Sequence, residues 1–383
     1  MDTKAFKNIS DFADEVAQFR EAVTNREPVQ YKGICGFDGF IDTFITMKQP
    51  ATMEKFGSKV AAAAGIAASY ESEHKGDKFG GNGPLIAAAL SDIFSNDIDI
   101  TYIGAMGADE VLPIYKEALE GKIRRLYTLA EPAHSDCLEF EDGKVMLSDM
   151  RSCDEITWDR LMEKIGADKL AEALEDCRFI GAVNWGKLPH AGVIWTNLAR
   201  QLSEMQVPKK QVAFFMDLAE FEARPMEDRE KLLQLFPEIT EQCHTMLSFN
   251  LKEAWQMAES FDGDFHAQKD PESVAELAVF LKEHIDVDRI IIHPNSGAAC
   301  ASADGCTYIP GPYCKKPLIS TGAGDNFGAG CIAACLEGFD NLGILLAGNC
   351  ASGHYVRSGN SASFKDMSTL LGHWLEGEVP ERL

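Results

Sequence analysis

A glycine-rich loop at residues 320–330 carries the residue types best suited to chemistry in this chain. It reads Ser-Thr-Gly-Ala-Gly-Asp and continues into an apolar stretch of small residues that predicts a helix. The glycines let the backbone approach a ligand closely, and the first amides of a helix lack internal partners, so the loop suits a phosphoryl group. Asp325 adds a carboxylate that can take the proton of an attacking hydroxyl. The pattern predicts a kinase that phosphorylates a small alcohol, with Asp325 as general base.

Two other interpretations of this loop remain open. Asp is a favoured N-cap residue, so Asp325 would also stand here if it only capped the helix. The glycine spacing also approaches the dinucleotide-binding fingerprint, which would indicate a dinucleotide-dependent oxidoreductase. That fingerprint normally follows the first strand and precedes an acidic residue ~20 positions further on. Because the loop lies late in the chain, the kinase is favoured over the oxidoreductase.

Further polar residues lie where the first predicted strand and a later helix meet the expected ligand edge. Asp38 and Asp42 stand four residues apart in Gly-Phe-Asp-Gly-Phe-Ile-Asp, and carboxylates accept hydrogen bonds from the hydroxyls of a sugar. Gly80 and Gly81 precede Asn82 and an apolar helix, and paired glycines allow close backbone approach. Taken alone, the first group is a turn with two solvated acids and the second is a helix start.

Asn250 and Glu253 follow another predicted strand in the pattern Asn-x-x-Glu. Such a pair can hold a hydrated Mg²⁺ beside phosphates, because Mg²⁺ keeps several waters and uses few protein ligands. The same spacing forms a helix capping box. The two interpretations are compatible. The sequence contains no P-loop, no His-Glu-x-x-His and no metal-spaced Cys/His cluster.

Composition limits the classes of partner. The formal net charge of the 383 residues is −24, and such a charge repels nucleic acid and anionic membranes. The eleven cysteines are scattered without a Cys-x-x-Cys pair, which favours reduced, structural thiols. We expect neither a signal peptide nor a membrane span, because no apolar run is long enough. These features predict a cytoplasmic protein.

Short apolar runs alternate with longer amphipathic segments, which predicts an α/β protein with a parallel sheet covered on both faces. The predicted strands are Gly33–Gly36, Ile100–Gly104, Phe179–Val183, Val212–Asp217, Thr245–Asn250 and Arg289–His293. The predicted helices are Pro84–Phe94, Leu112–Leu119, Trp158–Leu174, Ala191–Met205, Ala254–Ser260, Pro271–Glu283, Asn326–Glu337 and Leu342–Arg357. Residues 43–79, with a helical piece at Met53–Tyr70, and a hairpin at residues 134–151 break the alternation and predict a small β lid.

The order Gly-Phe-Asp-Gly-Phe-Ile-Asp, Gly-Gly-Asn, Asn-x-x-Glu, Gly-Ala-Gly-Asp resembles the PfkB family of carbohydrate kinases across roughly residues 31–360. The resemblance implies one ribokinase-like α/β domain over residues 1–383, with a doubly wound, mostly parallel sheet and a small β lid. It also implies ATP and Mg²⁺ as cofactors and a small sugar-like substrate. Lids of this family often pair, which leaves a homodimer through the lid open.

The resemblance also implies a role for individual residues. Asp325 would be the base, and the amides of Gly322, Ala323 and Gly324 would form the anion hole. Asn250 and Glu253 would organise Mg²⁺ and phosphate. The substrate would contact Asp38, Asp42, Gly80, Gly81, Asn82 and Asn184, and the adenine would lie beside Asn295, Gly297, Asn349 and Ser352.

Several departures from the family pattern leave specificity open. Leu85 stands where ribokinase carries an asparagine, which argues against ribose, and Ile319 replaces an aspartate near the usual monovalent-cation loop. His293-Pro294-Asn295 replaces the usual adenine-side motif, so nucleotide specificity is open. The paired acids favour an unphosphorylated sugar, with Arg151 the one nearby cation that would favour a sugar phosphate. A nucleoside kinase of the same fold and a non-catalytic sugar or nucleotide sensor remain alternatives.

Overall fold

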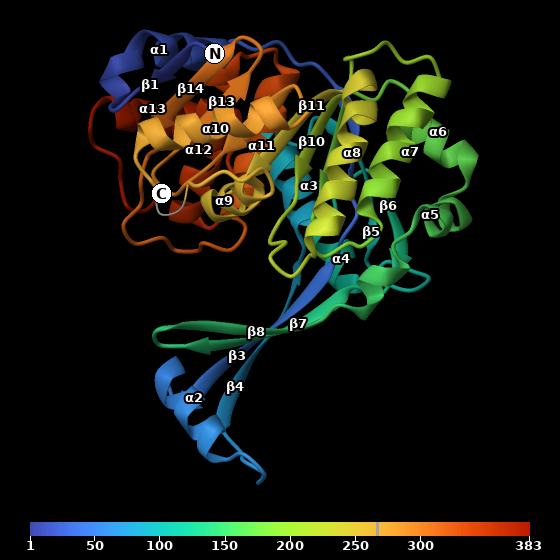
Figure 1. Ribbon diagram of the computed structural model, residues 1–383, viewed down its shortest axis with the longest axis vertical. Helices are drawn as coiled ribbons and strands as arrows, with labels where there is room; N and C mark the ends of the chain where they lie inside the picture. Colours follow the sequence, from blue (N-terminus) through green and yellow to red (C-terminus); the bar gives the residue numbers. More distant parts are fainter. Residues whose placement is uncertain (266–267) are drawn as a thin grey trace.

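The body of the molecule is built on a ten-stranded sheet, seen in a computed structural model that describes residues 1–265 and 268–383 (Figure 1). Neighbouring strands are parallel except on either side of β13, which runs antiparallel to both its neighbours. In spatial order the strands are β1 (Thr3–Ala5), β14 (Gly305–Pro310), β13 (Gly297–Ser302), β12 (Arg289–Ile292), β11 (His244–Phe249), β10 (Ala213–Asp217), β9 (Phe179–Val183), β2 (Tyr31–Gly36), β5 (Ile98–Ala105) and β6 (Arg125–Ala130).

Helices cover both faces of this sheet, so its central strands are buried on both sides and read as continuous apolar runs. One core lies beneath α5 (Trp158–Ile165), α6 (Ala167–Leu174), α7 (Ala191–Glu204), α8 (Met226–Gln242), α9 (Leu251–Glu259) and α10 (Pro271–His284). The other lies beneath α1 (Ala13–Thr24), α3 (Asn82–Ile93), α4 (Pro113–Leu119), α11 (Ala323–Leu336), α12 (Asn341–Ser358) and α13 (Phe364–Leu375). The architecture confirms the predicted fold class.

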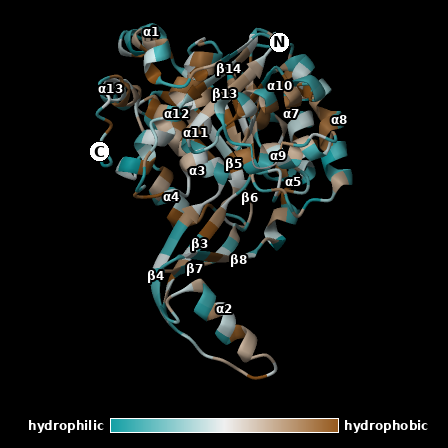
Figure 2. Cartoon of the chain, turned by 60° about the vertical axis from the view of Figure 1, so that its left-hand side comes forward, coloured by the Kyte–Doolittle hydropathy of each residue, from teal (hydrophilic) through white to brown (hydrophobic). Residues whose placement is uncertain are grey.

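A second, four-stranded sheet projects from the body and carries α2 (Met53–Ala62) near its outer end (Figure 1). Its strands, in spatial order, are β4 (Glu71–Gly80), β3 (Phe40–Gln49), β7 (Ala133–Phe140) and β8 (Gly143–Asp149). Brown, apolar residues concentrate inside the body, whereas the outer part of β4 is mostly teal (Figure 2). We call this sheet with α2 the lid. A single domain and pairing through the lid stay predictions.

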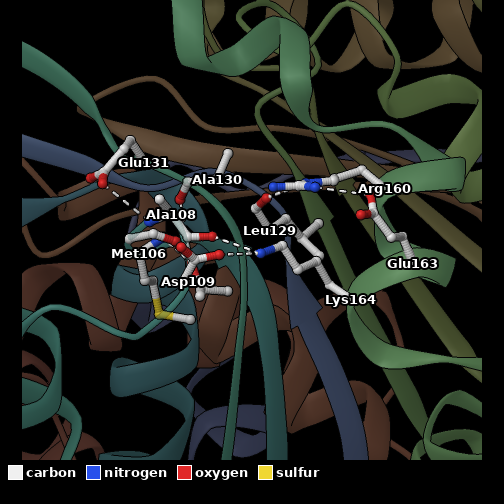
Figure 3. A network of polar contacts seen from close by, with 11 residues as sticks. Met106, Ala108, Asp109, Leu129, Ala130, Glu131, Arg160, Glu163 and Lys164 are labelled. Atoms are coloured by element: carbon white, nitrogen blue, oxygen red, sulfur yellow. Dashed lines mark hydrogen bonds and ion pairs between the residues drawn. The ribbon is translucent and has the colours of Figure 1, made fainter.

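Polar contacts hold the far edge of the main sheet against α5 (Figure 3). Lys164 donates to the Ala108 carbonyl and pairs with Asp109, both at 2.9 Å. Arg160 donates to the Leu129 carbonyl at the end of β6. These contacts fix the loop that follows β5, close to where the chain leaves the body for lid strand β7.

The structure differs from the sequence expectations in several elements. The predicted helix Trp158–Leu174 is two helices, because Gly166 adopts a φ of 79° between them. The predicted helix Met53–Tyr70 ends at Ala62, and Glu71–Gly80 is a strand.

All eleven cysteines are free thiols, and nine of them are buried. Among the described residues, no helix combines the length and the apolar character that crossing a bilayer requires.

Candidate active site

A cavity of about 1730 Å³ lies between the lid and the edge of the main sheet where the parallel strands end. Ligands of parallel sheets bind at this edge. Residues from β10, α3, α9 and α11 meet lid residues around it. The sequence-predicted residues that line it are Asp42, Gly80, Gly81, Asn82, Asn184, Asn250, Glu253, Gly322, Gly324 and Asp325.

Asp325 lies in the first turn of α11 and is only 6% exposed. Its Oδ1 accepts a hydrogen bond of 2.8 Å from Nδ2 of Asn82, the first residue of α3. The starts of two helices, 243 residues apart in sequence, therefore meet at this carboxylate. Burial, followed by the charge of Asp217, raises the pKa of Asp325 well above its ordinary value. A raised pKa makes a carboxylate a stronger base once it is ionised.

The loop before Asp325 has the conformation that close approach to an anion requires. Gly322 adopts a φ of 90°, and a Cβ there would lie 2.9 Å from the Tyr355 hydroxyl oxygen, so only glycine fits. The Ala323 amide donates to the Ser320 carbonyl at 3.1 Å and is already used inside the loop. The Gly324 amide has no recorded acceptor in the described part of the chain. The Gly322 amide likewise has no acceptor within the described residues, so both of these amides are available to a phosphate oxygen.

Asp38 is fully buried and lies outside the cavity lining. Its two carboxylate oxygens accept hydrogen bonds of 2.8 Å from the amides of Asn82 and Gly83, and 2.6 Å from Asn184 Nδ2. The carboxylate thus ties the start of α3 to the end of β9. These contacts favour a positioning role for Asp38, and substrate contact by this residue stays a prediction.

Asp42 sits on lid strand β3 against the double glycine. A Cβ on Gly80 would lie 2.5 Å from Asp42 Oδ2, and one on Gly81 would lie 3.1 Å from Asp38 Oδ2. The two glycines therefore make room for the two aspartates, which explains why both motifs occur. Burial raises the pKa of Asp42, while the Ser135 hydroxyl and Lys144 oppose that rise.

Asn250 and Glu253 form the capping box that the spacing predicts at the start of α9, with reciprocal hydrogen bonds of 3.0 Å. Both residues also line the cavity, and Glu253 is 5% exposed. Burial and the charge of Asp217 raise the pKa of Glu253, and burial raises the pKa of Asp217 in turn. Two buried carboxyl groups that resist ionisation together are typical of a site completed by a cation.

This donor set fits Mg²⁺ held mainly by phosphates and water. No group of three or more His, Cys, Asp or Glu side chains converges on a metal position within residues 1–265 and 268–383. Mg²⁺ needs no such cage when nucleotide phosphates supply its ligands. Asn184 Oδ1 is buried and finds no hydrogen-bond partner among the described residues. Asn184 also adopts a left-handed φ of 62°, a strain that is typical of functional sites. This oxygen is oriented by Asp38 and adjoins the cavity.

Among the cavity-lining residues that sequence reasoning missed are Asp217, Lys144 and Tyr355. Asp217 ends β10 and accepts a hydrogen bond from the Ala219 amide, and an acid at the end of a predicted strand was its only signal. Lys144, on lid strand β8, places its Nζ 3.4 Å from Thr321 Oγ1 in the anion loop. Tyr355 donates from its hydroxyl to the Thr321 carbonyl. Arg151, the expected cation, pairs instead with Asp149 outside the cavity lining.

The residues expected beside adenine lie away from the cavity lining. Asn349 is 7% exposed and donates from Nδ2 to the Pro310 carbonyl. A Cβ on Gly311 would lie 3.5 Å from the Gly297 Cα and 3.6 Å from the Asn349 side chain, so these residues pack together. Asn295 and Ser352 also fall outside the lining, so contact between adenine and these four residues stays a prediction. His293 does line the cavity, stacked on the Phe327 ring, and burial lowers its pKa to about 4.

Solved structures share the fold of this chain. The structure is similar to that of a carbohydrate kinase from Agrobacterium tumefaciens, with a TM-score of 0.63, 18% identity and coverage of 92% of this chain and 98% of that one. It is also similar to ribokinase of Arabidopsis thaliana complexed with ribose and ATP, with a TM-score of 0.61, 14% identity and coverage of 91% and 99%. The fold is therefore that of the ribokinase-like carbohydrate kinases.

The sequence comparison narrows the class to one family. A model of the prokaryotic ketohexokinase family matches residues 11–374, and the chain belongs to that family. A ketohexokinase of Haloferax volcanii is 23% identical over 354 residues, which cover 89% of this chain and 91% of the relative. The protein is accordingly an ATP-dependent carbohydrate kinase, a phosphotransferase with an alcohol group as acceptor. This confirms the predicted enzyme class.

Proposed function

We propose that the protein transfers the γ-phosphoryl group of ATP to a hydroxyl of an unphosphorylated ketohexose, with Asp325 as the general base. The observation that carries the proposal is the buried Asp325 carboxylate beside the anion loop, where the starts of α3 and α11 meet. The ketohexose is suggested by the family of the chain and by its Haloferax relative.

The residues divide the reaction between them. Asp42 on the lid accepts hydrogen bonds from sugar hydroxyls and orients the acceptor. Asp325 takes the proton of the attacking hydroxyl, while Asn82 holds the carboxylate in place. The Gly324 amide and the N-terminal end of α11 stabilise the charge that develops on the transferred group. Lys144 extends this positive charge from the lid.

Three residues would hold the waters of Mg²⁺: Asp217 and Glu253 through their carboxyl groups, and Asn250. Bound there, Mg²⁺ would neutralise phosphate oxygens during transfer. Closure of the lid would exclude water and limit ATP hydrolysis without acceptor.

The test is release of ADP from Mg-ATP over a panel of ketohexoses, aldohexoses, pentoses, nucleosides and fructose 1- and 6-phosphate. We expect turnover with a ketohexose, and we expect Asp325→Asn to fold normally and lose about 10²–10⁴-fold in kcat, the range for a general base. An active Asp325→Asn enzyme would contradict the assignment of Asp325 as the general base. Turnover with a nucleoside or a sugar phosphate alone would contradict the assignment of an unphosphorylated ketohexose as substrate. Nucleotide binding without any turnover would favour a non-catalytic sensor.

A further inference from the structure

A second cavity lies at the opposite edge of the main sheet from the active site. Its volume is about 260 Å³, and it is lined by residues at the beginnings of parallel strands: Tyr31 of β2, Arg178 before β9, Lys210 and Ala213 at β10, His244 of β11 and Arg289 of β12. Because the active site lies where these strands end, the sheet separates the two cavities by about 16 Å, the length of a five-residue strand. The end of α11, which begins at the anion loop, lines one side of the second cavity through Cys335 and Leu336.

Positive charge dominates this small cavity. Arg178, Lys210 and Arg289 all line it, and Lys210 pairs with Asp288 at 2.8 Å. Asp288 lies outside the lining and also accepts hydrogen bonds from Thr245, so its carboxylate is fully occupied. Neither Arg178 nor Arg289 makes an ion pair within the described residues. Two guanidinium groups thus line one cavity without an ion pair of their own in the described residues, in a chain of net charge −24.

The pKa of His244 is also affected by the positive charge of this cavity. Burial lowers the pKa of His244, the charges of Arg289 and Lys210 lower it further, and Asp288 opposes them.

A structural explanation of these cations is that they stabilise the carbonyl end of α11. That end already has partners of its own. The Tyr31 hydroxyl donates to the Leu336 carbonyl at 2.9 Å, and the amides of Gly338 and Phe339 donate to the carbonyls of Cys335 and Ala334 at 3.1 and 3.0 Å. Arg289 donates from Nε to Asn341 Oδ1, which leaves its two terminal nitrogens without a recorded partner in the described chain. The guanidinium groups therefore have donors in excess of what the helix end uses.

We propose that this cavity is a binding site for a small phosphate-bearing molecule, with its phosphoryl group held between Arg178 and Arg289. Guanidinium groups bind phosphate oxygens in pairs through parallel N–H donors, and such bonds are stronger than neutral ones. The volume is just below the range for drug-sized ligands, so it suits a compact one. The site is separate from the catalytic cavity, and it does not depend on the proposed sugar substrate.

The experiment is equilibrium dialysis of the full-length protein against ³²P-labelled inorganic phosphate at fixed ionic strength. Mg²⁺ and the non-hydrolysable ATP analogue AMP-PNP are present at saturation to fill the catalytic cavity. We expect a phosphate site that persists under these conditions and weakens at least 10-fold in Arg178→Gln. Lys209→Gln, which removes an exposed lysine paired with Glu241 outside the cavity, should bind phosphate as the wild type does.

Arg178 is exposed, and its side chain makes no hydrogen bond or ion pair with residues 1–265 or 268–383, so Arg178→Gln should fold. The double variant Arg178→Gln/Arg289→Gln should abolish binding, with circular dichroism checking its fold. Unchanged phosphate affinity in the folded Arg178→Gln protein would overturn the proposal. Phosphate binding that the folded double variant retains at wild-type affinity would also overturn it, because the phosphate would then occupy another site.

Discussion

Three buried carboxyl groups share the active site, and their mutual repulsion makes each of them sensitive to what fills it. Asp217 raises the pKa of both Glu253 and Asp325, and burial is the larger cause in each case. Such clusters of raised pKa values are characteristic of catalytic sites. In this protein they also impose a cost on the empty enzyme, because a buried carboxyl group resists ionisation.

Glu253 should therefore make the empty enzyme less stable as pH rises. Its pKa is raised to about 8 in the folded chain, against about 4.3 when unfolded. The folded state thus binds its proton more tightly, so this stabilisation is complete below pH ~4.3 and is lost as pH rises toward 8. Glu253→Gln keeps a capping residue and removes the titration. Urea unfolding between pH 5 and 9 should show the variant gaining stability relative to wild type as pH rises, and parallel curves would contradict this.

Asp42 should control the affinity for the acceptor. Its carboxylate faces the cavity from the lid, distant from the anion loop in sequence. Loss of a hydrogen bond to a charged group costs about 1.5–3 kcal/mol, so Asp42→Ala should raise KM for the sugar about 10- to 100-fold and KM for ATP far less. The matched control is Asp136→Ala, on neighbouring lid strand β7 but outside the cavity lining. Equal effects of Asp42→Ala on the KM values for sugar and ATP would show that Asp42 does not bind the acceptor specifically.

At the scale of elements, the site depends on helices that begin at one edge of the sheet. α3 and α11 lie on the same face, and their first turns contact each other through Asn82 and Asp325. The lid brings a different set of groups to the same cavity. Lys144 on β8 contacts Thr321 from the lid side, so a lid strand and the anion loop are joined by one cation.

Removal of that cation should impair catalysis without harming the lid. Lys144 is exposed, so Lys144→Gln should leave the fold intact, and kcat/KM should fall about 10-fold because a charge-assisted contact is lost. Lys48→Gln is the matched control, since Lys48 lies on lid strand β3, pairs with Glu73 and stands outside the cavity lining. Steady-state kinetics of both variants decide the matter. Full activity in Lys144→Gln would exclude a role for the lid cation.

At the scale of the whole molecule, the net charge of −24 sets the response to salt. Like charges destabilise a compact state, and salt screens them because the Debye length falls from about 30 Å at 0.01 M to about 10 Å at 0.1 M. We expect Tm to rise as KCl increases from 0.01 to 0.5 M. An uncharged osmolyte that leaves ionic strength unchanged separates screening from general solute effects. A fall in Tm would mean that the surface ion pairs outweigh the net repulsion.

Local patterns determined much of this protein before any tertiary contact was known. Alternating apolar runs identified the parallel sheet, because strands buried on both faces must be continuously apolar. The capping box at Asn250 and the positive φ at Gly322 follow from backbone chemistry within a few residues. Elements without such a pattern escaped prediction. β4 is exposed along most of its length and lacks an alternating pattern, and α8 contains Pro237, which normally ends a helix.

The remaining features of the site were decided by tertiary structure alone. Asp38 and Asp42 share one motif, yet packing buries the first among backbone amides and turns the second toward the cavity. Asp217 and Lys144 acquire their positions through strand pairing and through the lid. The sequence by itself determined the fold class and the anion loop, because both rest on local periodicity and backbone conformation. Only the tertiary structure brought together carboxylates from β10, α9 and α11, because their proximity depends on contacts between residues far apart in the chain.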